Sequence, residues 1–360
     1  MNICILTFEF NYNYGAVLQA YALSKTLQKW GHTVCIMNRG WDTYAGAHPR
    51  RLSLKRIPGY LMGKFITLKP FKDFKRQYLH FTKPIENYTD LSLESDKFDL
   101  AIVGSDQIWN DEIFPYMGLY YFAESFHSVP RIAYAVSFGK DTFTVPLQYD
   151  KKLKKELSRF SALSVREDSG IQILSNLGFQ AKQVLDPTFL LSKDDYPIES
   201  SYHHYKYVCR FLLDENSSKR QYIQKFAQHH SYKEVNNYLN KDYSVPVIRK
   251  IINNKYISIP KWLSNIKNAD FVITDSFHGM VFSIIFERQF LVFRNKKRGN
   301  ARFESLLGKL GLLNHLISED NSFSEHYDEI DYAKVNNILE TLKKDSLEYL
   351  ECALEIINKI

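Results

Sequence analysis

The sequence lacks the patterns of several large protein classes. Its 360 residues include only four cysteines, Cys4, Cys35, Cys209 and Cys352, and these have no paired spacing. Neither a zinc site nor a disulfide framework is therefore indicated, and reduced thiols are expected. The longest apolar runs, such as 280–286, are much shorter than the roughly 20 residues that a membrane-spanning helix needs.

Targeting and nucleotide-binding signatures are also absent. The start, Met1-Asn2-Ile3-Cys4, has neither the basic residues nor the long apolar core of a signal peptide, so we expect a cytoplasmic protein. No Gly-x-Gly-x-x-Gly follows the first predicted strand and no phosphate-loop pattern is present, which argues against a dinucleotide or nucleoside triphosphate site. No histidine-rich constellation appears, and we expect no metal.

The composition that is present is that of a globular protein with a sizeable core. Hydrophobic residues make up 45% of the chain and aromatic residues 15%, and the length suggests two domains. The net charge of +7 is unevenly distributed. Between Arg50 and Arg76, nine lysines and arginines stand against a single acid, Asp73.

Apolar and aromatic residues alternate with the charges of this basic segment. Such a mixture suits contact with an anionic membrane surface through residues 50–76, at the inner face of the membrane, or a lipid-diphosphate acceptor. The alternative is a solvated helical insertion, about residues 47–76, over the first domain. No nucleic-acid-binding motif accompanies the segment, so nucleic acid is not expected as a partner.

Strand and helix signals alternate from the start of the chain. A strand over 3–8, a helix over 15–30 closed by Gly31 and a strand over 33–37 form a βαβ beginning. Further strands are predicted over 98–103, 131–136, 162–165 and 183–185, with helices over 147–160 and 168–177. The pattern favours a parallel, doubly wound α/β domain over residues 1–192.

A second α/β domain is predicted over residues 200–360. The polar segment 192–205 with Pro197 is typical of a linker. Strands are expected over 207–213, 234–238, 271–274 and 290–293, and helices over 218–229, 261–268, 279–287, 302–310 and from about 332 to the end. Two such domains facing each other leave a cleft at the carboxyl ends of their strands, and the terminal helix is expected to brace the first domain.

Polar motifs follow the predicted strands of the first domain. Asn13-Tyr14-Gly15 is either a substrate loop, in which Gly15 permits close backbone approach, or a helix N-cap loop. In the segment 104–110, Asp106 could accept hydrogen bonds from sugar hydroxyls and Trp109 could form a platform for a sugar ring. The alternative for that segment is a capped turn with a tryptophan in the core.

Two arginines are candidates for binding an anion. Arg166 follows the strand over 162–165, where its guanidinium could make bidentate contact with phosphate or carboxylate, or pair instead with Glu167 or Asp168. Arg302 follows the strand over 290–293 and could also reach the cleft. Lys296 is better explained as a solvated surface residue.

His278 stands at the start of a predicted helix, directly after the buried strand over 271–274. Free backbone N–H groups and the helix dipole favour an anion there, and the imidazole adds a group that can donate or accept a proton. A lone histidine is more often structural, so its position at a strand end is what makes it a candidate.

Five of these motifs together resemble the polysaccharide pyruvyl transferase family over residues 1–312. They are Asn13-Tyr14-Gly15-Ala16-Val17-Leu18-Gln19, Gly104-Ser105-Asp106-Gln107-Ile108-Trp109, Ser164-Val165-Arg166-Glu167, Leu185-Asp186-Pro187-Thr188 and Thr274-Asp275-Ser276-Phe277-His278-Gly279. The resemblance implies a GT-B-like fold, with two Rossmann-like domains around a cleft. It also implies transfer of pyruvate from phosphoenolpyruvate to a sugar, forming a ketal and releasing phosphate, without a redox cofactor.

By the same resemblance, His278 is the acid–base residue, and Arg166, Ser276, Gly279 and Arg302 bind the donor. Asn13, Tyr14, Gly15, Asp106 and Trp109 are expected on the acceptor side. The acceptor would be a sugar of a surface polysaccharide or its precursor, carried on lipid diphosphate or a nucleotide. Some members have a basic residue where this chain has Ser276, and Arg302 is expected to compensate.

Two other functions are compatible with the sequence. A GT-B glycosyltransferase would use the same cleft and anion-binding helix start for a nucleotide sugar. A non-catalytic glycan-binding or scaffolding protein would bind a glycan without any donor.

Overall fold

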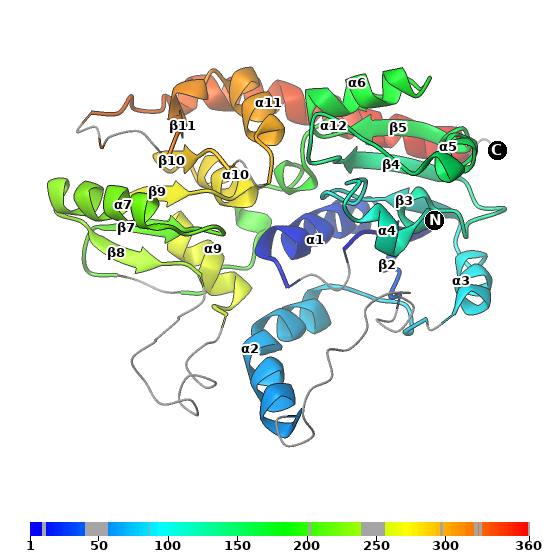
Figure 1. Ribbon diagram of the computed structural model, residues 1–360, viewed down its shortest axis with the longest axis horizontal. Coiled ribbons are helices and arrows are strands. Elements are labelled where there is room, and N and C mark those ends of the chain that lie inside the picture. Colours follow the sequence, from blue (N-terminus) through cyan, green and yellow to red (C-terminus); the bar gives the residue numbers. More distant parts are fainter. Residues whose placement is uncertain are drawn as a thin grey trace.

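The protein forms two parallel β-sheets, each covered by helices on both faces (Figure 1). The computed structural model describes residues 1–8, 12–39, 57–85, 87–200, 203–238, 256–295, 298–319, 323 and 326–358. The first sheet has the order β2-β1-β3-β4-β5-β6 and the second the order β11-β10-β9-β7-β8. All strand pairs in both sheets are parallel, as the alternating strand and helix signals predicted.

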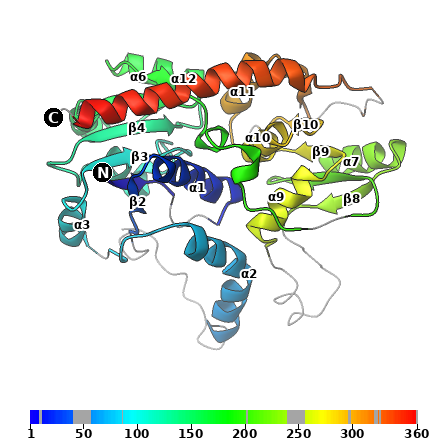
Figure 2. The same ribbon diagram turned by 180° about the vertical axis from the view of Figure 1, so that it is seen from behind.

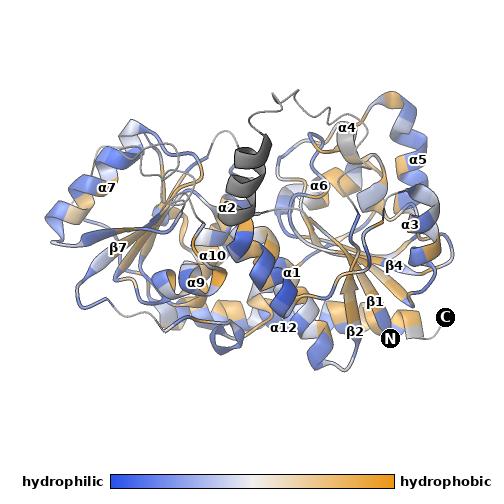
Figure 3. Ribbon diagram, turned by 90° about the horizontal axis from the view of Figure 1, so that it is seen from below, coloured by the Kyte–Doolittle hydropathy of each residue, from blue (hydrophilic) through white to orange (hydrophobic). Residues whose placement is uncertain are grey.

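The strands lie close to the predicted ranges. In the first sheet they are β1 (Asn2–Leu6), β2 (Thr33–Ile36), β3 (Leu100–Val103), β4 (Arg131–Val136), β5 (Phe160–Val165) and β6 (Lys182–Gln183). In the second they are β7 (Tyr207–Phe211), β8 (Lys233–Asn236), β9 (Phe271–Thr274), β10 (Phe290–Phe293) and β11 (Leu316–Ile317). Every residue of β3, β4, β9 and β10 is buried, because helices cover both faces of each sheet (Figure 3).

Two of the described α-helices were not predicted from the sequence. The predicted ones are α1 (Tyr14–Lys29), α5 (Leu147–Leu157), α6 (Asp168–Asn176), α7 (Ser217–His229), α9 (Ile259–Lys267), α10 (Phe277–Ile285), α11 (Ala301–Leu310) and α12 (Tyr332–Asn358). The short helices α3 (Tyr88–Ser95) and α4 (Phe114–Met117) were not predicted, nor was β11. These three are too short to show a clear hydrophobic period.

The basic insertion is helical in the part that the structure describes. Helix α2 (Ile57–Tyr78) packs on α1 through the buried rings of Phe71 and Phe74. Residues 40–56, with the first cations of the segment, lie outside the described residues. No described helix has both the length and the apolar character needed to cross a membrane.

Both sheets change strand order at one central point. In the first sheet β1 lies between β2 and β3, and in the second β7 lies between β8 and β9. The connections that follow β1 and β3 therefore run toward opposite edges of the first sheet, and those that follow β7 and β9 toward opposite edges of the second. Ligands of doubly wound sheets bind at this switch point, beyond the carboxyl ends of the strands. Residues 104–107 follow β3 and residues 275–278 follow β9, so both predicted motifs occupy switch points.

Helix α12 connects the two sheet domains (Figure 2). At its start, the Tyr332 hydroxyl donates to the Arg288 carbonyl in the second domain. Further along, the Ser346 hydroxyl accepts a hydrogen bond from the Leu185 amide at 2.9 Å in the first domain, and Tyr349 donates to a β4 carbonyl at 3.3 Å. The expectation that the terminal helix braces the first domain is therefore confirmed.

An aromatic cluster joins the two domains. Tyr14 at the start of α1 stacks on Trp262 of α9, with ring centroids 5.0 Å apart, and its hydroxyl donates to the Ile257 carbonyl at 2.9 Å. Phe71 and Phe211 also pack on Tyr14. Tyr14 is thus a buried interdomain packing residue, which corrects its predicted place in an acceptor loop.

Candidate functional site

The carboxylate of Asp186 lies at the centre of a buried polar cluster. Its Oδ2 atom accepts hydrogen bonds from Arg166 Nη1 at 2.5 Å and from the Ser105 hydroxyl at 3.1 Å, and it lies 3.5 Å from His278 Nε2. Its Oδ1 atom accepts from the amide and hydroxyl of Thr188 at 3.0 and 2.7 Å. Asp186 therefore joins groups from α10 and from the segments that follow β3 and β5, although it was not predicted as a site residue.

Asp186 is ionised across the usual pH range. Burial alone raises the pKa of a carboxyl group, but His278, Arg166 and the Thr188 hydrogen bond outweigh this effect at Asp186 and hold its pKa well below the usual range. The sequence signal was the Asp-Pro-Thr turn after β6, which gave no indication that its carboxylate faces inward.

His278 is placed by its own helix and by two contacts with the first domain. It lies in the first turn of α10, where the Ser276 hydroxyl caps the helix by accepting from the Gly279 amide at 3.4 Å. The imidazole is only 6% exposed, with Nε2 toward Asp186. On its other side lies Gly15, where a Cβ atom would stand 1.9 Å from His278 Nδ1. The close approach that Gly15 permits is therefore to His278.

Ser276 and Gly279, which were predicted to bind the donor, both have structural roles at the start of α10. The hydroxyl of Ser276 and the amide of Gly279 satisfy each other at the helix cap. A Cβ on Gly279 would lie 2.4 Å from Thr274 Oγ1, so glycine lets α10 pack directly on the end of β9. The Gly279 amide therefore already has a hydrogen-bond acceptor within the protein.

Arg166 emerges from β5 into the interior with a side chain that is 3% exposed. Besides its ion pair with Asp186, its Nε lies 3.8 Å from Glu167 Oε2, and its guanidinium lies 4.5 Å from the centre of the Phe277 ring. Its Nε and Nη2 atoms have no hydrogen-bond partner among the described residues. The alternative pairing with Glu167 is therefore the weaker of two contacts.

Glu167 instead anchors the loop after β4. Its Oε1 atom accepts from the Ser137 hydroxyl at 2.8 Å and from the amides of Phe138 and Gly139 at 2.9 and 3.2 Å. This loop touches the second domain, because a Cβ on Gly299 would lie 2.5 Å from the Gly139 carbonyl. The sequence reasoning did not identify this contact between the domains.

Arg302 from α11 lies on the same aromatic ring as Arg166. Its guanidinium is 5.7 Å from the Phe277 ring centre, and its Nη2 donates to the Arg298 carbonyl at 3.0 Å. The Gln107 carboxamide lies beside it and, with its oxygen on that side, accepts from both Nη atoms at 2.7 and 2.8 Å. Burial and the nearby charge of Arg166 lower the pKa of Arg302 to about 10. Lys296 lies outside the described residues.

The acceptor-side predictions have mixed outcomes. Asp106 adopts a left-handed conformation with φ of 79°, its Oδ1 accepts from the Gln107 amide at 2.8 Å, and its charge favours the protonated forms of Arg166 and Arg302. Trp109 is 1% exposed, stacks on Phe122 and donates to a main-chain carbonyl at 2.8 Å. The predicted sugar platform is therefore wrong for Trp109, whose ring faces the core.

Asn13 acts as the N-cap of α1. Its Oδ1 atom accepts a hydrogen bond from the Gly15 amide at 2.9 Å, which is the N-cap alternative for this loop. The side chain is partly exposed.

Among the described residues, no three histidine, cysteine, aspartate or glutamate side chains are grouped to hold a metal ion.

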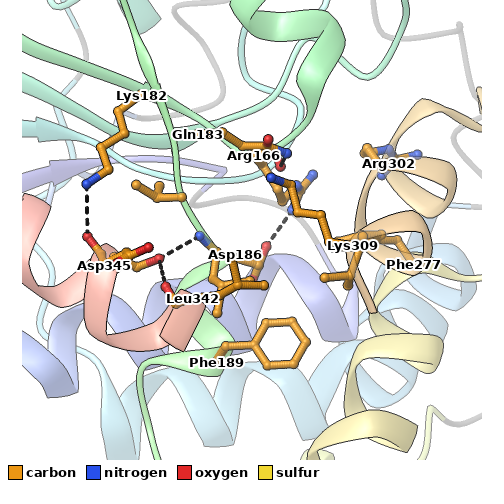
Figure 4. Close-up of a pocket in the computed structure, with 14 residues that line it drawn as sticks. Arg166, Lys182, Gln183, Asp186, Phe189, Phe277, Arg302, Lys309, Leu342 and Asp345 are labelled. Carbon is orange, nitrogen blue, oxygen red and sulfur yellow. Dashed lines mark hydrogen bonds and ion pairs between the residues drawn. The ribbon is translucent and has the colours of Figure 1, made fainter. Parts of the chain in front are cut away.

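A cavity of about 140 Å³ lies beside the cluster, between β6, α11 and α12 (Figure 4). Arg166, Asp186, Phe277 and Arg302 line its inner end. The arrangement can hold a small anion against two guanidinium groups, and His278, which lies 3.5 Å from Asp186 and does not line the cavity, can exchange a proton.

The fold is similar to those of solved sugar-processing enzymes. The glycotransferase of kitacinnamycin matches with a TM-score of 0.51 at 11% identity, covering 99% of this chain and 98% of that chain. UDP-GlcNAc 2-epimerase from Neisseria meningitidis bound to UDP-GlcNAc matches with a TM-score of 0.49 at 11% identity, covering 99% and 94%. The predicted GT-B-like α/β architecture is confirmed. At this identity, the likeness concerns the fold alone.

No curated protein sequence matches the chain significantly. A family model does match: the model described as polysaccharide pyruvyl transferase covers residues 13–297, which is most of the chain and includes Arg166, Asp186 and His278. The strand-end motifs and the buried cluster that they form fall within this match, so the chain belongs to the polysaccharide pyruvyl transferase family.

Proposed function

We propose that this protein transfers a pyruvyl group from phosphoenolpyruvate to a sugar of a surface polysaccharide or its precursor, forming a pyruvate ketal and releasing phosphate. The observation that carries the proposal is the convergence of Arg166 and His278 on Asp186, with Arg302 on the same Phe277 ring as Arg166. Two buried guanidinium groups with unpartnered N–H groups suit a donor that carries both a phosphate and a carboxylate.

Donor binding is assigned to the two arginines. Both guanidinium groups lie on the ring of Phe277, so a compact dianionic or trianionic acid can contact them together. Ser276 stands where some family members carry a basic residue, and Arg302 supplies the second cation in its place. Their charges would stabilise the phosphate as it leaves.

His278 is assigned as the acid–base residue. As imidazolium it would donate a proton to the methylene carbon of the donor, which places positive charge at the adjacent carbon. A sugar hydroxyl adds to that carbon and gives its proton back to His278, the carbon–oxygen bond to phosphate breaks, and a second hydroxyl closes the ketal as its proton passes to the leaving phosphate. The ionised Asp186, 3.5 Å from Nε2, would orient the ring.

The acceptor is assigned to the side of Asp106 and Asn13. The Asp106 carboxylate can accept from sugar hydroxyls. We further propose that the sugar is carried on lipid diphosphate or a nucleotide, and that residues 50–76 bring the cytoplasmic protein to the inner face of the membrane. Binding to vesicles with and without anionic lipid tests this contact, and equal binding to both would contradict it.

The test of the activity supplies phosphoenolpyruvate with candidate sugar acceptors and measures phosphate release together with the mass increase of a pyruvyl ketal. His278→Ala and Arg166→Ala should each abolish turnover while the circular dichroism spectrum is unchanged. The matched controls are His229→Ala, which is exposed on α7, and Arg220→Ala, which is half-buried on the same helix. Both should behave as wild type.

The alternatives predict different outcomes in the same assays. A glycosyltransferase would release a nucleoside diphosphate from a nucleotide sugar and leave phosphoenolpyruvate unchanged. A non-catalytic glycan-binding protein would bind glycan equally well after His278→Ala and bind no donor. Either result would overturn the proposal.

A further inference from the structure

Helix α6 of the first domain is capped by a side chain of the second domain. Within the part of the chain that the structure describes, its own N-cap residue, Glu167, makes no capping hydrogen bond. The amide of Asp168, the first residue of the helix, donates instead to the Ser305 hydroxyl oxygen at 3.3 Å. Ser305 lies on α11 and is 8% exposed. The start of α6 therefore depends on contact with the other domain.

The Ser305 hydroxyl oxygen has a second partner in the first domain. Gln183 Nε2 donates to Ser305 Oγ at 2.8 Å and to the Arg166 carbonyl at 3.1 Å. Figure 4 shows Gln183 beside Arg166. A hydroxyl oxygen has two acceptor positions, so the first domain occupies both of them on Ser305. Ser305 is thereby bonded to Asp168 directly and to Arg166 through Gln183.

The position of Arg302 follows from these contacts of α11. Arg302 precedes Ser305 by three residues, and residues three apart in a helix lie on the same face. Three residues before Arg302, Gly299 also meets the first domain, because a Cβ atom there would lie 2.5 Å from the Gly139 carbonyl. Arg302 thus lies between two contacts with the first domain. Its spacing from Arg166 is set by how α11 docks there, and not by the fold of either domain alone.

Docking of α11 brings two like charges together. The guanidinium groups of Arg166 and Arg302 lie 4.5 and 5.7 Å from the centre of the same Phe277 ring. Burial and the charge of Arg166 lower the pKa of Arg302 to about 10. Without a bound anion, the repulsion between the two cations favours separation of α11 from the first domain. The hydrogen bonds to Ser305 oppose this separation.

We propose that Ser305 is a positioning residue that docks α11 on the first domain and so sets the spacing of Arg302 from Arg166. The proposal rests on the proposed function in that the two arginines bind the donor together. A donor that contacts both arginines joins the two domains and holds α11 in place by itself. Loss of the Ser305 hydroxyl therefore lowers the docked fraction of the free protein and leaves the donor-bound protein docked. The apparent affinity for the donor falls by that fraction, while turnover at saturating donor is retained.

Hydrogen exchange of the full-length protein, measured without any donor, tests the docking. The Asp168 amide loses its acceptor in Ser305→Ala and should exchange about threefold to tenfold faster, as expected for the loss of one hydrogen bond. Mass spectrometry of the peptide that contains Asp168 measures this rate. The matched control is Ser95→Ala, because Ser95 is also buried but donates to the Leu91 carbonyl at 2.7 Å within the first domain. Exchange at wild-type rates in both variants would overturn the proposal.

Steady-state kinetics with phosphoenolpyruvate test the effect on the donor site. Ser305→Ala should raise the KM for phosphoenolpyruvate by about threefold to tenfold and change kcat by less than about twofold. Gln183→Met removes the amide that donates to Ser305 and should act in the same way. Both substitutions break one contact, so the KM of the double variant should lie within about twofold of the higher single value. Ser95→Ala should have wild-type constants.

Two kinetic results would overturn the proposal. A lower kcat with an unchanged KM in Ser305→Ala would show that the hydroxyl supports the reacting groups and not the docking of α11. Faster exchange of the Asp168 amide with unchanged KM and kcat would show that Ser305 only caps α6.

The two measurements also separate this proposal from the proposed function. Faster exchange in Ser305→Ala, in a protein that turns over no phosphoenolpyruvate with any acceptor, would support docking by Ser305 and contradict pyruvyl transfer. Pyruvyl transfer with the same KM and the same exchange rate in Ser305→Ala and the wild type would do the reverse.

Discussion

Replacing Gly15 with alanine should displace the His278 ring from its place against Asp186. A Cβ atom on Gly15 would stand 1.9 Å from His278 Nδ1 and 2.3 Å from the ring carbon Cγ, both far inside van der Waals contact. Contact distances are about 3.5 Å, so the ring or α1 must move by roughly 1.5 Å. Because helix α1 is fixed by Tyr14 in the interdomain aromatic cluster, we expect the ring to move.

Two effects set the expected losses of stability and turnover in Gly15→Ala: the overpacking of a buried site and the displacement of the proton donor His278. Overpacking of a buried site costs about 1–3 kcal/mol, and the higher helix propensity of alanine returns at most about 1 kcal/mol. A misplacement of about 1 Å at a reacting group lowers turnover by about a hundredfold. Gly15→Ala should therefore lose about 0–3 kcal/mol of stability and about a hundredfold in turnover.

Gly308→Ala is the matched control. This glycine lies in α11, and the nearest atom to its new Cβ would be 4.0 Å away, in ordinary contact. The variant should gain about 0.4–1 kcal/mol and retain full turnover. Urea unfolding and phosphate release with phosphoenolpyruvate measure both quantities. Wild-type turnover and stability in Gly15→Ala would refute the assignment of Gly15 as the residue that makes room for His278.

Two further predictions concern buried ion pairs. The pKa of Asp186 is lower in the folded protein than in the unfolded chain, where it is about 3.9. The ionised carboxylate therefore stabilises the fold fully at pH values above about 3.9, and this stabilisation is lost as the pH falls from there through the folded pKa. Asp186→Asn should lose about 3–5 kcal/mol of stability at pH 7, measured by urea unfolding, and should lose turnover. Below about pH 4 its stability should depend less on pH than that of the wild type, and an unchanged slope of stability against pH would contradict this. Lys219 lies 2.8 Å from the buried carboxylate of Asp275, which also accepts from the Leu213 amide at 2.6 Å. Lys219→Met should therefore cost about 3–5 kcal/mol, whereas exposed Lys334→Met should change stability by less than about 0.5 kcal/mol, as thermal unfolding would show.

Elements with a strong hydrophobic period could be predicted from the sequence. The spacing of apolar residues in α1, with Gly31 after it, placed that helix within one residue at each end. The apolar runs of β4 and β9 gave those strands with the same bounds. The parallel α/β class followed from their alternation, because consecutive parallel strands need a crossover helix between them.

Side-chain environments that depend on distant segments could not be predicted. Trp109 follows a strand as a ligand-binding aromatic residue would, but its partners, Phe122 and the Tyr121 carbonyl, belong to a short turn about a dozen residues later. Tyr14 is similar, since Ile257 and Trp262 come from the other domain. No local pattern encodes such contacts.

The candidate site was predictable in its parts but not in its centre. Arg166 and His278 were identified because each follows a buried strand, where parallel sheets bring side chains together. Asp186 also follows a strand, yet its Asp-Pro-Thr sequence is typical of a capped turn, and the Asp186 side chain does accept from Thr188. Only the neighbouring positions of β5 and β6 show that the other carboxylate oxygen faces Arg166.

The most direct test of the account is to follow phosphate release and ketal formation together, in one reaction of the purified protein with phosphoenolpyruvate and a sugar acceptor. Pyruvyl transfer with His278 as the proton donor predicts one phosphate for each pyruvyl ketal, no product with His278→Ala, and wild-type product with His229→Ala. If no acceptor supports phosphate release while a nucleotide sugar supports transfer, or if His278→Ala retains full turnover, the account is contradicted.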